Sequence, residues 1–170
     1  RTIKKDRKGG FYEKLWGQIP RNVGDTESIA KLKNNIISGC TGTLHSKIVQ
    51  ERYASLSFGE TDKISRSTRL DPNGFCPTLR AGTARDKGSF QAVRPIHPYH
   101  PRVITPREAA RLQGFPDWFR FHVTKWHSFR QIGNSVSPIV AEYILKGLYN
   151  LLNKRVQPEY LNHNSLEVRV

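Results

Sequence analysis

Apolar residues recur every three to four positions in three stretches of the chain, which is the pattern of a helix with one apolar face. The first stretch is residues 11–19, which Pro20 ends, and the second is residues 28–37. The third begins near Ser137 and Pro138 and carries a broad stripe: Val140, Ala141, Ile144, Leu145, Leu148, Leu151 and Leu152. A stripe of this width needs a surface to cover it, so we expect the last helix to pack on a partner.

A further helix is predicted from its capping residues. Thr105 is a good N-cap, Pro106 occupies the first helical position, and Glu108 follows three residues after the cap. This combination is a capping box with a proline at its preferred place. Gly114, with a proline two residues later, is expected to end the helix.

Between the helical stretches, the pattern favours strands and loops. Residues 38–75 are rich in Gly, Ser, Thr and Asp, with short apolar alternations at Tyr53, Leu56 and Phe58. We interpret them as loops and short strands. Residues 76–104 are expected to form strands joined by a polar loop, residues 81–89, which contains two glycines. Together with the helices, these elements indicate an α+β fold class.

The charge of the chain narrows its function. There are 28 Lys and Arg against 14 Asp and Glu, which gives a formal net charge of +14. A domain this basic usually binds a polyanion, most often nucleic acid; the alternative is a solvated basic surface without a partner. No apolar run approaches the ~18 residues of a membrane span, and no signal peptide is recognisable. The two cysteines are too few for a disulfide framework or a metal site and fit a cytoplasmic location.

Two segments carry a more specific signal. Residues 102–117 are RVITPREAARLQGFPD, and residues 129–138 are FRQIGNSVSP. In this order and at this spacing, they resemble the ninth and tenth conserved blocks of the DNA (cytosine-5)-methyltransferases. Residues 69–80, RLDPNGFCPTLR, resemble the part of that family's target recognition domain that ends in a Thr-Leu pair. The resemblance is good over residues 64–152 and loose over residues 1–63.

The resemblance implies that the Thr-Leu pair and the glycine-rich loop after it approach DNA in the major groove. Glycines let the backbone come close to a ligand, and arginine and lysine pair with phosphates or guanine edges. The predicted DNA contacts are Arg66, Arg69, Thr78, Leu79, Arg80, Gly82, Arg85 and Lys87. The plainer alternative is an ordinary hairpin loop that binds nothing.

The tenth block offers short polar groups just before a helix start, a place that suits a polar ligand group. By resemblance, this block lines the pocket for S-adenosylmethionine, and the helix after it packs on the sheet of the α/β methyltransferase domain. The predicted cofactor contacts are Asn134, Ser135 and Val136. The alternative is a plain N-cap on a core helix. In the ninth block, Arg107 and Arg111 lie four residues apart on one helix face, and we favour a scaffold role for them.

The catalytic residues of the family are not found in this sequence. In the family, a cysteine thiolate from a Pro-Cys dipeptide adds to C6 of a flipped cytosine, and a glutamate assists. Here Gly39 precedes Cys40 and Phe75 precedes Cys76, and the Glu-Asn-Val and Gln-x-Arg-x-Arg blocks are absent. We therefore expect the chain to be inactive alone, as a fragment of a single-chain enzyme or the small subunit of a split one. The start at Arg1 and the lack of methionine favour a fragment.

This interpretation divides the chain into three parts. Residues 1–104 are expected to form a target recognition domain with a basic amino-terminal arm, residues 105–153 helical blocks that complete the methyltransferase domain, and residues 154–170 a polar tail. The expected partners are double-stranded DNA and an N-terminal catalytic domain or large subunit, in a bacterial or phage-encoded restriction-modification system. The alternatives are a stand-alone sequence-specific DNA-binding module and a fragment of a tRNA cytosine-5 methyltransferase.

Overall fold

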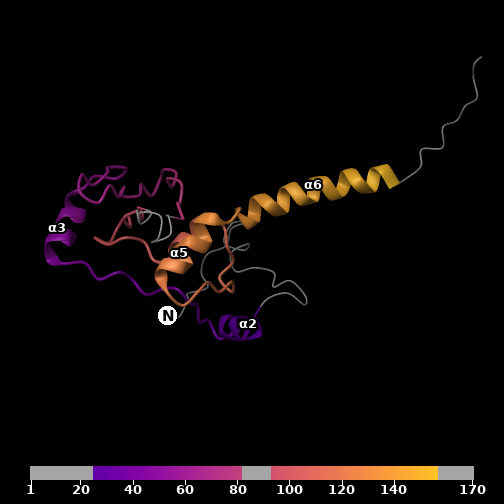
Figure 1. Ribbon diagram of the computed structural model, residues 1–170, viewed down its shortest axis with the longest axis horizontal. Coiled ribbons are helices and arrows are strands. Elements are labelled where there is room, and N and C mark those ends of the chain that lie inside the picture. The colour runs from indigo at the N-terminus through magenta and orange to yellow at the C-terminus, as the bar shows by residue number, and fades with distance from the viewer. Residues whose placement is uncertain (1–24, 82–92, 157–170) are drawn as a thin grey trace, which may run out of the picture.

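Helices joined by loops form most of the regular structure in the described part of the chain (Figure 1). The computed structural model describes residues 25–81 and 93–156. Its helices are α2 (Thr26–Lys33), α3 (Lys47–Ser55), α4 (Pro106–Leu112), α5 (Lys125–Asn134) and α6 (Pro138–Val156). α4 and α5 pack against each other, whereas α6 extends away from the rest of the described chain.

α4 forms as its capping residues predict. Thr105 Oγ1 accepts a hydrogen bond from Glu108 N at 3.2 Å, and the Glu108 carboxylate accepts one from Thr105 N at 2.8 Å. These bonds satisfy the backbone N–H groups of Thr105 and Glu108, both of which lack an intrahelical acceptor. Gly114 has a φ of +87°, which favours glycine, and Phe115 N donates to Ala110 O. The capping box and the glycine stop are both confirmed.

The structure also confirms a helix near residues 28–37 and one that begins at Pro138, but the first has different ends. Asp25 caps α2 by accepting a hydrogen bond from Glu27 N at 3.0 Å, so the helix starts earlier than predicted. It stops at Lys33 because Asn35 adopts a left-handed φ of +60°, which a helix cannot continue through. The helical turn expected over residues 11–19 lies outside the described residues.

The sequence pattern predicts neither α3 nor α5. α3 lies within residues 38–75, where we expected loops and short strands, and that expectation is wrong for residues 47–55. The apolar alternation around Tyr53 is misleading because Tyr53 is buried on one face of a helix. It packs there against Ile96 and Val103, with Val49 one turn earlier in partial contact.

Backbone pairing in the described residues is limited to isolated bridges. Thr61 pairs with Thr68, and Ile96 pairs with both Arg69 and Val103. Ile96 is fully buried at the centre of this arrangement. The strands expected over residues 76–104 are therefore reduced, where they are described, to pairing around Ile96. Because residues 82–92 lie outside the described part, the α+β fold class stays a prediction.

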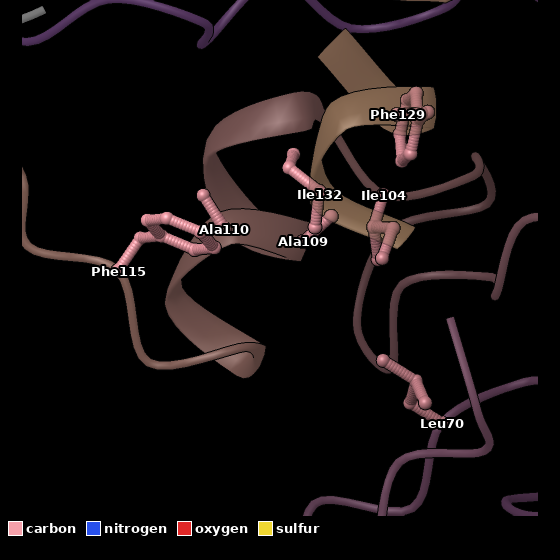
Figure 2. Packing of buried hydrophobic residues seen from close by; sticks show 7 residues of the cluster. All are labelled: Leu70, Ile104, Ala109, Ala110, Phe115, Phe129 and Ile132. Atoms are coloured by element: carbon pink, nitrogen blue, oxygen red, sulfur yellow. The ribbon is translucent and has the colours of Figure 1, made fainter. Parts of the chain in front are cut away.

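The main apolar core lies around α4 and α5 (Figure 2). Ala109 and Ala110 from α4 and Ile132 from α5 have no exposed surface. Cys76 and Leu79 pack on the edge of this core without being fully buried. The core consists of Leu70, Ile104, Ala109, Ala110, Phe115, Phe129 and Ile132. Full burial of each larger aliphatic or aromatic side chain contributes about 1.5–3 kcal/mol, so this cluster stabilises the packing of α4 on α5.

α6 differs because its apolar side chains are exposed. The large ones are exposed by between 51% (Val140, Leu148) and 82% (Tyr143). The full set is Val140, Tyr143, Ile144, Leu145, Leu148, Tyr149, Leu151 and Leu152. At 3.6 residues per turn, these positions cover roughly two thirds of the helix circumference. A helix that is apolar over so much of its surface is usually buried in a larger core.

The rest of the α6 circumference is polar. Glu142 and Lys146 form an ion pair on that side, and Asn150 follows one turn later. Among the described residues, no helix is long and apolar enough to span a membrane.

Candidate functional site

The Thr-Leu segment lies at the surface with one residue anchored in the core. Leu79 is half-buried and packs on the cluster around α4 and α5. Thr78 and Arg80, on either side of it, are exposed. Burial of Leu79 fixes the backbone, and its two neighbours remain accessible to a ligand. Leu79 is therefore an anchor, whereas Thr78 and Arg80 have the exposure that a DNA contact requires.

Gly133 of α5 lies directly against the end of this segment. A Cβ atom at Gly133 would lie 2.5 Å from Ala81 N and 2.7 Å from Arg80 C. These distances are too short for any side chain, so the backbone of the segment occupies the space that a side chain would fill. Glycine inside a helix costs about 1 kcal/mol relative to alanine, which makes Gly133 a signal that sequence reasoning could have used. We interpreted this position only as part of the tenth block.

The chain on the other side of residues 82–92 also contacts α5. The guanidinium of Arg94 lies over the Phe129 ring, 4.2 Å from its centroid, as a cation–π contact. Burial lowers the pKa of Arg94 from its ordinary value. Three of the predicted DNA contacts lie outside the described residues: Gly82, Arg85 and Lys87.

Arg69 has many contacts within the protein. Its Nε and Nη2 atoms donate to Pro98 O at 3.0 and 2.7 Å. Its Nη1 atom donates to the carbonyl oxygens of Ala54 and Leu56, and the guanidinium lies 5.0 Å from the Phe58 ring centroid. These contacts join the end of α3 to the loop at Pro98, which is a structural role. DNA contact by Arg69 stays a prediction.

Arg66 is exposed in a turn that a buried carboxylate organises. Asp62 accepts hydrogen bonds from Arg52 Nε at 2.8 Å and Ser65 N at 2.7 Å. Burial alone would raise the pKa of Asp62, but hydrogen bonds from Ser65 and Arg52 outweigh it and leave the pKa lowered. Arg66 itself has a φ of +56°, which a non-glycine residue adopts only when its surroundings hold it there. The turn therefore presents the Arg66 side chain to solvent in a fixed backbone conformation.

The predicted cofactor contacts lie at the junction of two helices. α5 ends at Asn134, and Ser135 is its C-cap, so both residues lie at the carboxyl end of one helix before the next begins. They lie just before the start of α6, as expected, and the end of α5 at the same place was not predicted. The carboxyl end of a helix carries partial negative charge and favours a cationic group. Asn134 and Val136 are exposed, whereas Ser135 Oγ donates to Ile132 O at 2.7 Å.

Two arginines of α4 have the scaffold contacts that the sequence favoured. Arg107 is only 3% exposed, and its guanidinium donates to the carbonyl oxygens of Ser38, Pro116 and Phe119. Burial lowers the pKa of Arg107 despite the opposing charge of Asp117. Arg111 binds the buried Asp117 carboxylate at 2.9 and 2.7 Å. This network ties the loop after α4 to residue 38.

A cavity of about 350 Å³ adjoins α4 and α5 and was not predicted. Two of the basic residues that line it are already paired. Arg120 bonds to Glu27 at 3.0 Å and lies 3.7 Å from Asp25, and Lys125 donates to Gly42 O. Because these cations already have partners within the protein, the cavity is not a candidate binding site for an anion.

Known proteins are similar in sequence to this chain over most of its length. The family model described as C-5 cytosine-specific DNA methylase matches residues 4–150. The type II methyltransferase M.XorII of Xanthomonas oryzae pv. oryzae is 50% identical over 120 residues, which is 71% of this chain and 28% of M.XorII. The type II methyltransferase M.AquIB of Picosynechococcus is 34% identical over 135 residues, which is 69% of this chain and 91% of M.AquIB.

The fold matches a solved structure as well. The crystal structure described as a DNA modification methyltransferase encoded within an E. coli prophage has a TM-score of 0.80 and 92% identity. The match covers 90% of this chain but 40% of that protein. This chain therefore spans less than half the length of M.XorII and of the prophage protein. It belongs to the C-5 cytosine-specific DNA methylase family.

Proposed function

We propose that the chain is the DNA-recognition half of a DNA (cytosine-5)-methyltransferase. In this proposal it selects a duplex sequence and completes the pocket for S-adenosylmethionine, which supplies the methyl group for C5 of a flipped cytosine. The cysteine nucleophile belongs to an N-terminal catalytic domain or a large subunit. The relatives' designation as type II methyltransferases supports a bacterial restriction-modification system as the setting.

The observation that carries this proposal is the uncovered apolar surface of α6. Its exposed side chains extend over most of the helix circumference, with Leu148 among them at 51%. A surface of this kind marks a contact with another part of a protein. The chain spans only 28% of M.XorII and 40% of the prophage protein, so the rest of such an enzyme is the natural cover.

DNA recognition is supported by charge and by exposure. The net charge of +14 favours a polyanionic partner. Arg80 and Thr78 are exposed on a segment that Leu79 anchors, and Arg66 is exposed on a rigid turn. Arginine can bind guanine through two hydrogen bonds or pair with phosphate, so either position can contribute to affinity or to base recognition.

The cofactor assignment fits the chemistry of the α5–α6 junction. S-adenosylmethionine carries a cationic sulfonium, an ammonium and a carboxylate. The carboxyl end of α5 and the amino end of α6 meet between Asn134 and Pro138, so carbonyl and N–H groups are both available there. The exposed Asn134 amide can donate and accept, and the exposed Val136 can cover an apolar part of the ligand. Ser135 then has a positioning role, because Gln113 Nε2 donates to its carbonyl oxygen at 2.9 Å.

The absence of a Pro-Cys dipeptide supports a separate source for the nucleophile. Neither Cys40 nor Cys76 is fully buried, and burial raises the pKa of the Cys76 thiol, which disfavours the reactive thiolate. M.AquIB supports a division into separate chains, because this chain matches 91% of it and it is still named a type II methyltransferase.

Leu148→Asp tests the proposal. The partner in this test is the rest of the 92%-identical prophage protein, expressed separately with an affinity tag. We expect Leu148→Asp to abolish co-purification with that partner, because a buried unpaired carboxylate costs several kcal/mol. Asn150→Asp, which places the same charge on the polar side of α6, is the matched control and is expected to preserve it.

Binding of the chain to duplex DNA and to tRNA is measured in parallel by fluorescence anisotropy at two salt concentrations. We expect duplex binding that weakens steeply with salt and that Leu148→Asp leaves intact. If the wild-type chain binds DNA but never the partner, it is a stand-alone DNA-binding module. A clear preference for tRNA over duplex DNA indicates an RNA methyltransferase instead. Either outcome contradicts the proposal.

A further inference from the structure

Gly133 is a glycine in a position where the helix itself does not require one. It lies inside α5 and does not have the left-handed φ that favours glycine elsewhere in this chain, for example at Gly114. Conformational freedom therefore does not explain it. Space does, because the atoms nearest to a Cβ at Gly133 are all backbone atoms of Arg80 and Ala81. Backbone cannot rotate aside as the end of a flexible side chain can.

Gly147 of α6 provides a contrast within the same chain. It also lies inside a helix, but a Cβ atom there meets nothing within 4 Å. A glycine inside a helix of this chain therefore need not have a close neighbour. The close approach at Gly133 is a specific feature of the crossing between α5 and the Thr-Leu segment.

The same face of α5 also holds the chain that follows residues 82–92. Phe129 lies four residues before Gly133, which places the two positions one above the other on a helix. Arg94 stacks on Phe129 at 4.2 Å, and the Arg80–Ala81 backbone lies on Gly133. One face of one helix therefore contacts the chain on both sides of the loop in which Gly82, Arg85 and Lys87 are predicted to reach DNA. α5 then ends at Asn134, the first of the predicted cofactor contacts.

We propose that Gly133 is a positioning residue for sequence recognition, and that the Phe129–Gly133 face of α5 fixes the Thr78–Ala81 segment relative to the α5–α6 junction. This inference rests on the proposed function. Gly133 sets how close the Arg80–Ala81 backbone comes to α5, and Arg94 stacks on Phe129 of the same helix face. A side chain at position 133 forces the Arg80–Ala81 backbone away from α5. A base contact from Arg80 then shifts, whereas phosphate attraction, which depends on overall charge, remains.

The test separates base selection from total DNA binding. The full chain is incubated with a pool of DNA duplexes that have a randomised centre, and bound duplexes are sequenced after selection. For Gly133→Ala, we expect the enrichment of the wild-type motif to fall roughly tenfold, the worth of one good base contact. Total binding to the unselected pool should stay within about twofold, because electrostatic attraction does not depend on base contacts. Gly147→Ala is the matched control, a helical glycine replaced in the same way, and should enrich the wild-type motif normally.

Each outcome decides the inference. If Gly133→Ala enriches the wild-type motif as strongly as the wild type, the inference is overturned. If circular dichroism indicates that Gly133→Ala does not fold, Arg94→Gln decides, because it removes the second contact on the same face without crowding the helix. Reduced enrichment by a folded Arg94→Gln supports the inference, and unchanged enrichment overturns it. If the wild-type chain enriches no motif at all, the proposed function fails, and the inference fails with it for that separate reason.

Discussion

The α4–α5 pair and α6 are both rich in apolar residues, but only the first is buried. Ala109, Ala110 and Ile132 have no exposed surface, whereas Leu148 of α6 is 51% exposed. The pair is also fastened by buried polar contacts, since Arg107 binds three backbone carbonyl groups. α6 extends away from the body (Figure 1), and most of its large apolar side chains are exposed by half or more.

This difference indicates that the two regions depend on different surfaces. The α4–α5 region is stabilised by residues of this chain, and substitutions there should act on the folding of the chain itself. α6 carries an apolar surface that nothing in the described residues covers, and substitutions there should act on association. The predictions below test this division from the largest expected effect to the smallest.

The largest effect is expected for Arg107→Ala. We expect it to lower the free energy of unfolding by about 3–5 kcal/mol, because it breaks a buried network and leaves carbonyl groups without a donor. Arg80→Ala, at an exposed position, should change that free energy by less than about 0.5 kcal/mol. Urea unfolding followed by circular dichroism measures both. Equal midpoints for the two variants would mean that the Arg107 network does not hold the fold.

Ile132→Ala and Leu148→Ala compare the two apolar surfaces directly. Ile132→Ala should lower the free energy of unfolding by about 3 kcal/mol, because it leaves a cavity in a fully buried position. Leu148→Ala should change the stability of the isolated chain by less than about 0.5 kcal/mol. Thermal unfolding of both variants measures the difference. A large loss with Leu148→Ala would place α6 in the core of this chain and remove the need for a partner.

Glu108 makes the stability of the α4–α5 region depend on pH. Burial alone would raise the pKa of Glu108, but hydrogen bonds from Arg102 and the Thr105 backbone outweigh it and lower the pKa to about 2. The lowered pKa means that the folded state favours the ionised carboxylate. Its contribution is complete above the unfolded pKa of 4.5 and is lost as the pH falls towards 2.

Glu108→Gln should therefore lower the free energy of unfolding by about 2 kcal/mol at neutral pH, a value below the full shift because Glu108 is partly exposed. The difference from the wild type should shrink as the pH falls from 4.5 to 2. Unfolding curves across this range measure it. A difference that stays constant with pH would show that the carboxylate charge is not responsible.

The smallest effect is expected for Gly147→Ala. A Cβ atom there meets nothing within 4 Å, so only helix propensity should change. We expect α6 to gain up to about 1 kcal/mol of local stability, seen as slower amide hydrogen exchange within the helix. Faster exchange would mean that α6 is crowded at this position in solution.

The elements that the sequence predicts well are those fixed by local chemistry. Thr105, Pro106 and Glu108 specify the start of α4 within four residues, and Gly114 specifies its end. α5 cannot be recognised in this way. The side chain of its N-cap, Thr124, bonds to His122 and His127 and caps no backbone N–H of the helix, and Gly133 lowers the helix propensity. Packing of Phe129 and Ile132 on α4 stabilises it, and such contacts are not visible in the sequence.

The candidate site shows the same limit. Arg69 and Arg80 are similar in sequence terms, since both are arginines near the Thr-Leu pair. Arg69 binds carbonyl oxygens of Leu56 and Pro98, 13 and 29 residues away, whereas Arg80 is exposed. Only the fold brings these acceptors to Arg69. The sequence therefore indicates which segment is basic, but not which arginines remain available to DNA.

Methyl transfer from labelled S-adenosylmethionine to DNA tests most directly whether this chain is the recognition half of a methyltransferase. The chain is assayed alone, then with the rest of the prophage protein, and then with that partner but carrying Leu148→Asp. We expect no transfer by the chain alone, transfer by the reconstituted pair, and loss of transfer with Leu148→Asp. Transfer by the chain alone that survives replacement of both Cys40 and Cys76 by alanine would contradict the proposal.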